Sequence, residues 1–198
     1  MFISLIRLNT KETRDEQKVH QILSECFDEK VNDVNAIYRK EYFCNQDTGE
    51  KTVFLKVYSA VEPVGTSRAL VDSRYCTEVD PSKRFKEGQV FEFKTTVYPC
   101  RKNHGSRYMI QDQTERLEWL ARKFADGGAE LGHGCVSEID LSPVIVKHSY
   151  STAKLGVKQY RGLIRISDAE KFVSLFEKGL GQGKAYGCGL LELKEVQQ

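Results

Sequence analysis

The chain has 198 residues, of which 40% are hydrophobic and 29% charged, and its formal net charge is +2. This composition is that of a globular protein with one large or two small domains, and no apolar run reaches the length of a membrane span. The first residues are too often interrupted by charge for a signal peptide, and six scattered cysteines without a Cys-x-x-Cys pair argue against a zinc site or a secreted disulfide framework. We therefore expect a cytoplasmic protein with reduced thiols and no membrane partner.

The first half of the chain predicts strands around one helix. Residues 1–8 alternate in hydrophobicity, as strands do. Thr13 and Glu16 match a capping box, and the apolar residues after them repeat at helical spacing: Val19, Ile22, Leu23, Cys26 and Phe27. Further strands are predicted at 37–44 and 52–59, joined by a turn, and over 68–79. The polar, proline-containing stretch 79–89 is the candidate domain boundary.

The second half repeats this order more clearly. A strand over 90–98 ends at Pro99, and an amphipathic helix over 113–124 ends at Gly127-Gly128. Ser167 and Glu170 match a second capping box, which opens a helix that stops at Gly179. The remaining extended stretches are residues 130–138, 143–148, 157–166 and 190–193.

This order of elements predicts an α+β protein. Strand, helix and paired strands occur twice, which favours two tandem ferredoxin-like (RRM-like) domains, each an antiparallel sheet with helices on one face. The predicted domains are residues 1–85 and 86–198.

Basic residues gather in the second half of the chain. Residues 93–111 hold four basic side chains and no acid, and residues 141–167 hold five and no acid. Two such windows suggest a surface for a polyanion, although solvated lysines on ordinary strands explain them equally well.

The glycine-rich stretch GLGQGKAYGCGLLEL, residues 179–193, places five glycines in eleven residues before the last strand. It is not a P-loop, because the helix precedes it and Ala185 follows Lys184, and it lacks the third glycine of a dinucleotide-binding loop. Two explanations of the glycines remain open. Their exposed amides, together with Lys184, bind phosphate groups, or they form turns that let the last strand pack against the rest of the protein.

The same stretch is similar to the C-terminal signature of the RAMP superfamily of CRISPR-associated proteins. More closely, the chain resembles the CasE-type pre-crRNA endoribonucleases of the type I-E Cascade complex over nearly its full length. The segments that carry the likeness are VHQILSECF, FEFKTTVYPCRKN, ERLEWLARK, YRGLIRI and the glycine loop. The resemblance implies two ferredoxin-like domains, binding of the CRISPR repeat RNA hairpin, one metal-independent cut at the 3′ base of its stem, and retention of the product among other Cascade subunits.

Metal-free RNA cleavage uses the 2′-hydroxyl of the substrate, and it needs a general acid or base and a cation. His20 matches the catalytic histidine of the family, although its pattern alone favours a partly buried helix histidine, and His148 is the second choice. Lys154 lies about where the family places its catalytic lysine, with Lys158 as the rival. Gln17 stands where some relatives carry a tyrosine, so Tyr160 or Tyr186 is expected to take over that role if Gln17 does not.

For RNA binding we expect Arg101, Lys102 and Arg107 in the basic turn, together with Lys158 and Lys184. No cofactor or metal is expected. Three other classes remain open: a non-catalytic RNA-binding subunit, a structural assembly protein, and a metal-dependent nuclease, for which we find no carboxylate cluster.

Overall fold

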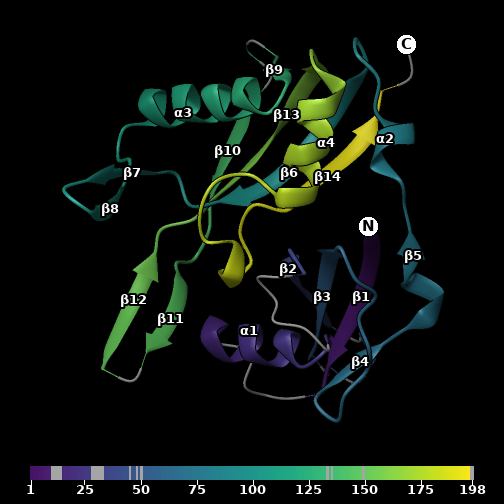
Figure 1. Cartoon of the computed structure of the whole chain (residues 1–198). Coiled ribbons are helices and arrows are strands. Elements are labelled where there is room, and N and C mark those ends of the chain that lie inside the picture. The colour runs from purple at the N-terminus through teal and green to yellow at the C-terminus, as the bar shows by residue number, and fades with distance from the viewer. Residues whose placement is uncertain are drawn as a thin grey trace.

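The computed structural model describes residues 1–9, 15–27, 34–44, 46–47, 49, 51–132, 134, 136–148 and 150–196, and for Ser73 and His148 the backbone alone. Two antiparallel sheets lie one above the other in Figure 1, the N-terminal sheet below and the C-terminal sheet above. In the described part of the chain, none of the helices is long and apolar enough to cross a membrane.

The lower sheet has the strand order β2-β3-β1-β4, with β5 paired to β1. Its elements are β1 (Phe2–Leu8), α1 (Glu16–Ser24), β2 (Ile37–Cys44), β3 (Lys51–Ser59), β4 (Ala69–Val71), the 3-10 turn η1 (Ser73–Tyr75) and β5 (Thr77–Glu78). Helix α1 covers one face, where Val19, Ile22 and Leu23 pack on the inward residues of the strands. Burial of each such side chain contributes roughly 1.5–3 kcal/mol to stability, and this contribution stabilises the packing of α1 on the sheet.

The lower sheet lacks a helix between β3 and β4. Residues 60–68 cross between them in an extended path, and this short segment contains Pro63 and Gly65, which both disfavour a helix interior. The less regular order predicted for the first half thus has a physical cause.

The upper sheet has the order β10-β13-β6-β14, with β9 paired to β13. Its elements are α2 (Pro81–Arg84), β6 (Val90–Val97), β7 (Cys100–Asn103), β8 (Ser106–Met109), α3 (Gln113–Asp126), β9 (Ala129–Leu131), β10 (Ser137–Asp140), β11 (Val144–His148), β12 (Ser151–Leu155), β13 (Lys158–Ile166), α4 (Ala169–Lys178), the 3-10 turn η2 (Lys184–Tyr186) and β14 (Leu191–Glu195). Helices α3 and α4 cover one face of it (Figure 1). The predicted α+β class, with antiparallel sheets in ferredoxin-like order, is confirmed.

Two hairpins project from the upper sheet, and neither was predicted as a strand pair. β7 and β8 pair through a turn at His104 and Gly105, whose φ angles of 45° and 83° are those of the tight turn that joins two-residue hairpins. β11 and β12 form the second hairpin, inserted between β10 and β13. The polar and basic sequences of β7 and β8 hide the alternation that marks a strand. β11 falls within the extended stretch predicted at 143–148, but its partner β12, with the sequence STAKL, was not predicted.

Helices α1 and α4, for which capping boxes were predicted, are both capped by an aspartate. Thr13 lies outside the described residues, and Asp15 caps α1 by accepting a hydrogen bond from the amide of Gln17. The box at Ser167 is wrong: the cap of α4 is Asp168, whose carboxylate accepts from the amide of Lys171 at 3.1 Å. Aspartate caps as well as serine does, and the helix begins one residue later than predicted.

The two halves share buried surface. Tyr58 of β3 packs against Phe176 of α4 with ring centroids 5.1 Å apart, and Ile37 of β2 belongs to the same core cluster. Beside them, the carboxylate of Glu192 in β14 pairs with Arg39 and with Lys56, at 2.9 Å from Lys56 Nζ. Burial raises the pKa of Glu192, but the hydrogen bond from Lys56 and the nearby positive charges outweigh it and leave that pKa below its usual value. These contacts join β2 and β3 of the lower sheet to α4 and β14 of the upper half.

Candidate functional site

His20 lies on α1 at the junction of the two halves. Its side chain is half-buried, and its ring meets the ring of Tyr186 edge to face, with centroids 6.5 Å apart. The Nδ1 atom is buried and has no hydrogen-bond partner among the described residues. Burial lowers the pKa of His20 below its usual 6.5, because an imidazolium would bury an N–H without an acceptor. The imidazole is therefore neutral at neutral pH, as a general base must be.

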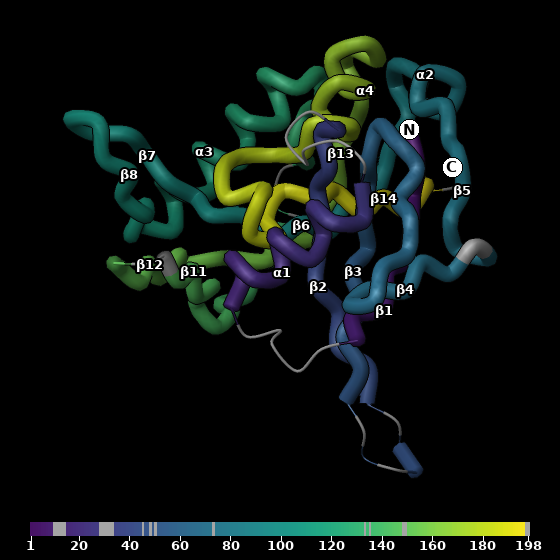
Figure 2. Tube along the Cα trace, turned by 60° about the horizontal axis from the view of Figure 1, so that its bottom comes forward, coloured from purple at the N-terminus to yellow at the C-terminus, as the bar shows by residue number. Residues whose placement is uncertain are grey.

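The glycine-rich loop carries Tyr186 to this position. All five of its glycines have positive φ, and η2 stands between left-handed Gly183 and Gly187. A Cβ on Gly189 would lie 2.6 Å from the carbonyl oxygen of Leu180, and one on Gly187 would lie 3.3 Å from the ring of Tyr38. The loop folds back on itself and on β2, so the packing alternative accounts for its glycines. Figure 2 shows this loop, in yellow, beside α1.

A buried hydrogen-bonded network joins the loop to α1. The hydroxyl of Tyr38, on β2, lies 3.0 Å from Glu16 Oε2 and 3.2 Å from the carbonyl oxygen of Ala185, so it shares its proton between both acceptors. Lys40 pairs with the other oxygen of Glu16. Burial, followed by the charge of Glu16, raises the pKa of Tyr38 well above its usual value and keeps its hydroxyl protonated.

The β11–β12 hairpin lies against α1, where the amide of Lys147 donates to Asp15 Oδ1 at 3.3 Å. Lys154 is exposed on β12 and shares a hairpin face with its partner Ile145, opposite the face that buries Val146. A cavity of about 770 Å³, the junction cleft, is lined on the hairpin side by Val144 and Ile145, one from each face. Its lining also includes Glu16, Lys40, Tyr42 and Tyr186. The side chain of His148 lies outside the described residues.

The rivals named from the sequence have partners of their own. Lys158 is only 12% exposed and pairs with Asp140. Tyr160 is fully buried, and its hydroxyl donates to Glu138 Oε2 at 2.6 Å. Burial and that hydrogen bond raise the pKa of Tyr160, so its proton is held inside the upper sheet, away from any substrate.

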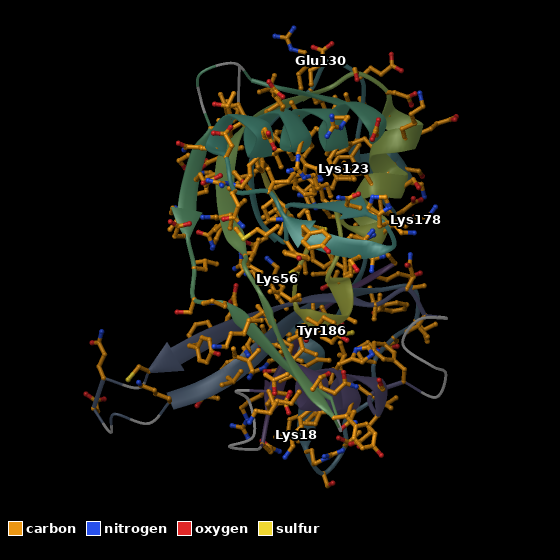
Figure 3. All side chains as sticks on the ribbon, turned by 90° about the vertical axis from the view of Figure 1, so that its left-hand side faces the viewer. Lys18, Lys56, Lys123, Glu130, Lys178 and Tyr186 are labelled. Atoms are coloured by element: carbon orange, nitrogen blue, oxygen red, sulfur yellow. The ribbon has the colours of Figure 1, made fainter. Side chains whose placement is uncertain are left out.

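A second cavity, of about 560 Å³, opens on the other side of the glycine-rich loop. Its lining, which we call the cationic groove, holds one acid, Asp126, and six basic side chains: Lys102, Arg107, Lys123, Lys171, Lys178 and Lys184. Lys123 pairs with Asp126, and Lys171 pairs with Asp168. Burial lowers the pKa of Lys184, and repulsion from Lys178 and Lys123 lowers it further. Figure 3 shows Lys123 and Lys178 in the upper half of the molecule and Tyr186 at the junction below them. A cluster of like charges is relieved by a bound polyanion.

The structure divides the predicted basic turn between two faces. Lys102 and Arg107 are register partners on the groove side, together with Cys100, which also lines the groove. Arg101 pairs with Tyr108 on the opposite face, where its guanidinium lies 3.4 Å from Glu115. Sequence reasoning missed Lys123, Lys171 and Lys178, because acids separate them along α3 and α4 and only the helical period brings them to one face.

The comparisons with known proteins decide the family. The model of a family described as CRISPR associated protein matches residues 1–195. The chain belongs to this CRISPR-associated protein family. The CRISPR-associated endoribonuclease Cse3 of Thermus thermophilus is 27% identical over 141 residues, which cover 63% of this chain and 66% of that protein. The Cascade subunit CasE of Escherichia coli is 30% identical over 92 residues, or 44% and 42% of the two chains. The resemblance to the CasE-type proteins is thereby confirmed.

The fold is also that of the family. A solved structure of Thermus thermophilus Cse3, bound to an RNA representing a pre-cleavage complex, has a TM-score of 0.73 at 18% identity and covers 98% of each chain. Tandem ferredoxin-like domains are therefore the architecture of this protein. Among the described residues, no group of three or more histidine, cysteine or acidic side chains could hold a metal ion, and none of the five described cysteines is in a disulfide.

Proposed function

We propose that this protein is an endoribonuclease that binds the CRISPR repeat hairpin and cuts pre-crRNA at the 3′ base of the stem without a metal ion. The observation that carries the proposal is the neutral, half-buried imidazole of His20, which lies at the junction of the halves with the cationic groove on the far side of the same loop. A base and a polyanion-binding surface thus meet at one loop. The names of the sequence relatives, an endoribonuclease and a Cascade subunit, support the same role.

The reaction balances without a metal. His20 takes the proton from the 2′-hydroxyl, the 2′-oxygen bonds to the adjacent phosphorus, and the bond from phosphorus to the 5′-oxygen breaks. The products are a 2′,3′-cyclic phosphate and, once the leaving oxygen gains a proton, a 5′-hydroxyl. A cation stabilises the charge that develops on the phosphorane oxygens. Lys154 is our candidate for it, since it shares a hairpin face with Ile145 of the junction cleft, whereas Lys158 is held by Asp140.

The cationic groove is our candidate for the RNA stem. Lys102 and Arg107 extend along a projecting hairpin that can follow the stem, and Lys123, Lys178 and Lys184 converge behind them. Double-stranded RNA is recognised mostly through its shape and its phosphates, which suits a surface of spaced cations. Tight retention of the cut RNA then makes the protein a Cascade subunit with the crRNA and the other subunits as partners.

A single-turnover cleavage assay on repeat-hairpin RNA in EDTA tests the proposal. We expect wild-type protein to cut once and leave a cyclic phosphate. A substrate with 2′-deoxyribose at the cut site should not react, because it lacks the nucleophile. His20→Ala should slow cleavage by about 10²–10⁴-fold while its affinity for RNA stays within about twofold.

Each outcome decides a part of the proposal. Normal cleavage by His20→Ala contradicts the assigned active site. Loss of wild-type activity in EDTA contradicts the metal-free mechanism. Tight binding without any cleavage, with or without Mg²⁺, identifies a non-catalytic RNA-binding subunit instead.

A further inference from the structure

Tyr186 is the polar aromatic side chain that the structure places against His20. Its ring meets the imidazole edge to face at 6.5 Å, and it lines the junction cleft. An edge-to-face contact of this kind favours one ring orientation over others. The Nδ1 atom of the same imidazole is buried.

The loop that carries Tyr186 is joined to α1 through Tyr38 of β2. Tyr38 binds the carbonyl of Ala185, the residue before Tyr186, and also Glu16, one helical turn before His20. These contacts form a closed ring of interactions. Glu16 and His20 lie on the same helix, and His20 contacts Tyr186. The neighbouring residue, Ala185, is linked back to Glu16 by the hydroxyl of Tyr38. A closed path of this kind limits how far the two rings can move apart.

The neighbouring alternatives do not serve this purpose. Tyr160 is fully buried and donates to Glu138 in the upper sheet. Gln17 is half-buried on α1, and its side chain makes no hydrogen bond to any residue that the structure describes; its backbone amide donates to Asp15. Tyr186 therefore is the tyrosine whose position bears on His20.

We propose that Tyr186 is a positioning residue for His20, and that Tyr38 and Glu16 hold the turn that presents it. The inference rests on the proposed function, in which His20 is the general base. Tyr186 fixes the orientation of the imidazole, and it shields the imidazole from water so that the ring stays neutral. Its role is carried by the aromatic ring, and the hydroxyl group is not required.

Several titratable or charged groups surround this site, and each is a potential influence on its pH dependence. Those on the elements packed around His20 are Asp15, Glu16 and Lys18 of α1 and its cap, Tyr38 and Lys40 of β2, Lys147 of β11, and Lys184 and Tyr186 of η2. Glu16 is already paired with Lys40 and Tyr38.

The experiment measures single-turnover cleavage of repeat-hairpin RNA across pH for wild type, Tyr186→Phe, Tyr186→Ala, Tyr38→Phe and the double variant Tyr38→Phe/Tyr186→Ala. We expect Tyr186→Phe to cleave within about twofold of wild type, because the ring remains. Tyr186→Ala should cleave about fivefold to tenfold more slowly, with the acid limb of its profile moved to higher pH as water reaches the imidazole. Tyr38→Phe should move the profile in the same direction by less, and the double variant should be no slower than Tyr186→Ala, since both changes act on one contact.

RNA affinity and thermal unfolding of each variant separate positioning from folding. RNA affinity should stay near wild type for Tyr38→Phe and Tyr186→Phe. The unfolding temperature should stay near wild type for Tyr186→Phe but fall for Tyr38→Phe, because the latter removes a buried hydrogen-bond donor to Glu16 and Ala185. If Tyr186→Phe is as slow as Tyr186→Ala, the hydroxyl acts on the substrate and the positioning role is wrong. If Tyr186→Ala keeps the wild-type rate and profile while His20→Ala is inactive, the inference fails and the proposed function stands. Should His20→Ala itself cut normally, the proposed active site fails first.

Discussion

The two sides of the glycine-rich loop differ in how their polar groups are satisfied. On the α1 side, Glu16 is paired with Lys40 and Tyr38, and His20 is neutral, so the charges are balanced within the protein. On the groove side, burial lowers the pKa of Lys184, and repulsion from Lys178 and Lys123 lowers it further. Apart from the unpartnered Nδ1 of His20, the α1 side is balanced within the protein and suits chemistry that needs fixed geometry. The groove side becomes more favourable when an anion binds.

One loop supports both sides, so we expect the largest effect from a substitution that distorts the backbone of this loop. Gly189 has a φ of 89°, and a Cβ there would lie 2.6 Å from the carbonyl oxygen of Leu180. We expect Gly189→Ala to lower the free energy of unfolding by about 3 kcal/mol and to weaken RNA binding and cleavage together. Urea unfolding followed by circular dichroism measures the first, and the two RNA assays measure the others.

Gly88→Ala is the matched control. Gly88 also has positive φ, at 82°, but a Cβ there would meet nothing within 4 Å. Its cost should be about 1 kcal/mol, which is the conformational cost alone, with RNA binding and cleavage unchanged. Equal losses in the two variants would contradict the close packing of the loop.

A smaller effect should separate the two faces of the β7–β8 hairpin. Arg107 lines the cationic groove, while Arg101 lies on the other face beside Glu115. Arg107→Ala should weaken binding of the repeat hairpin about fivefold to tenfold near physiological salt and reduce the slope of log K against log salt by about one. Arg101→Ala should change affinity by less than about twofold.

Filter binding over a series of KCl concentrations tests this pair. Cleavage at saturating protein should remain at the wild-type rate for both variants, because the groove side contributes binding and not chemistry. If Arg101→Ala proves the more damaging change, the RNA lies on the outer face of the hairpin and the groove is not its site.

The smallest effect concerns the pH dependence of stability on the α1 side. The folded protein binds a proton at His20 more weakly than the unfolded chain does, because burial lowers this pKa below 6.5. The contribution of His20 to stability is therefore lost as pH falls below 6.5. The free energy of unfolding of wild type relative to His20→Gln should decrease between about pH 7.5 and about pH 5. If the difference in free energy of unfolding between the two proteins is constant across that range, His20 is exposed to solvent in the folded protein and the assigned burial is wrong.

Much of the architecture could be predicted from local patterns. The strand at 37–44 and the helix of residues 113–126 have clear periodicity, and the structure places them where the sequence does, with the helix two residues longer. The hairpins were not predicted as strand pairs, although the stretch 143–148 that contains β11 was predicted as extended, because pairing depends on partners across a turn and β7, β8 and β12 are mostly polar. Ser167 failed as a cap because Asp168 is an equally good acceptor, and sequence alone does not choose between adjacent candidates.

The candidate site, like the fold, could be predicted from the sequence only in part. The motifs pointed to the family, the resemblance to that family pointed to His20, and the basic turn pointed to Lys102 and Arg107, since a motif in the right context needs no coordinates. That Lys158 is held by Asp140 and that Arg101 faces Glu115 could not be inferred, because those acids are 18 and 14 residues away.

By itself the sequence determined the α+β class, the family and the chemical types available for the reaction, because these depend on periodicity and on local motifs. Only the tertiary structure decided which groups meet. It brought Tyr186 to His20 across 166 positions of chain, with Tyr38 and Glu16 behind them, and it gathered the lysines of two helices into one groove. The physical reason is that such contacts arise from the packing of two sheets and from five left-handed glycines that turn the loop, and no local pattern encodes them.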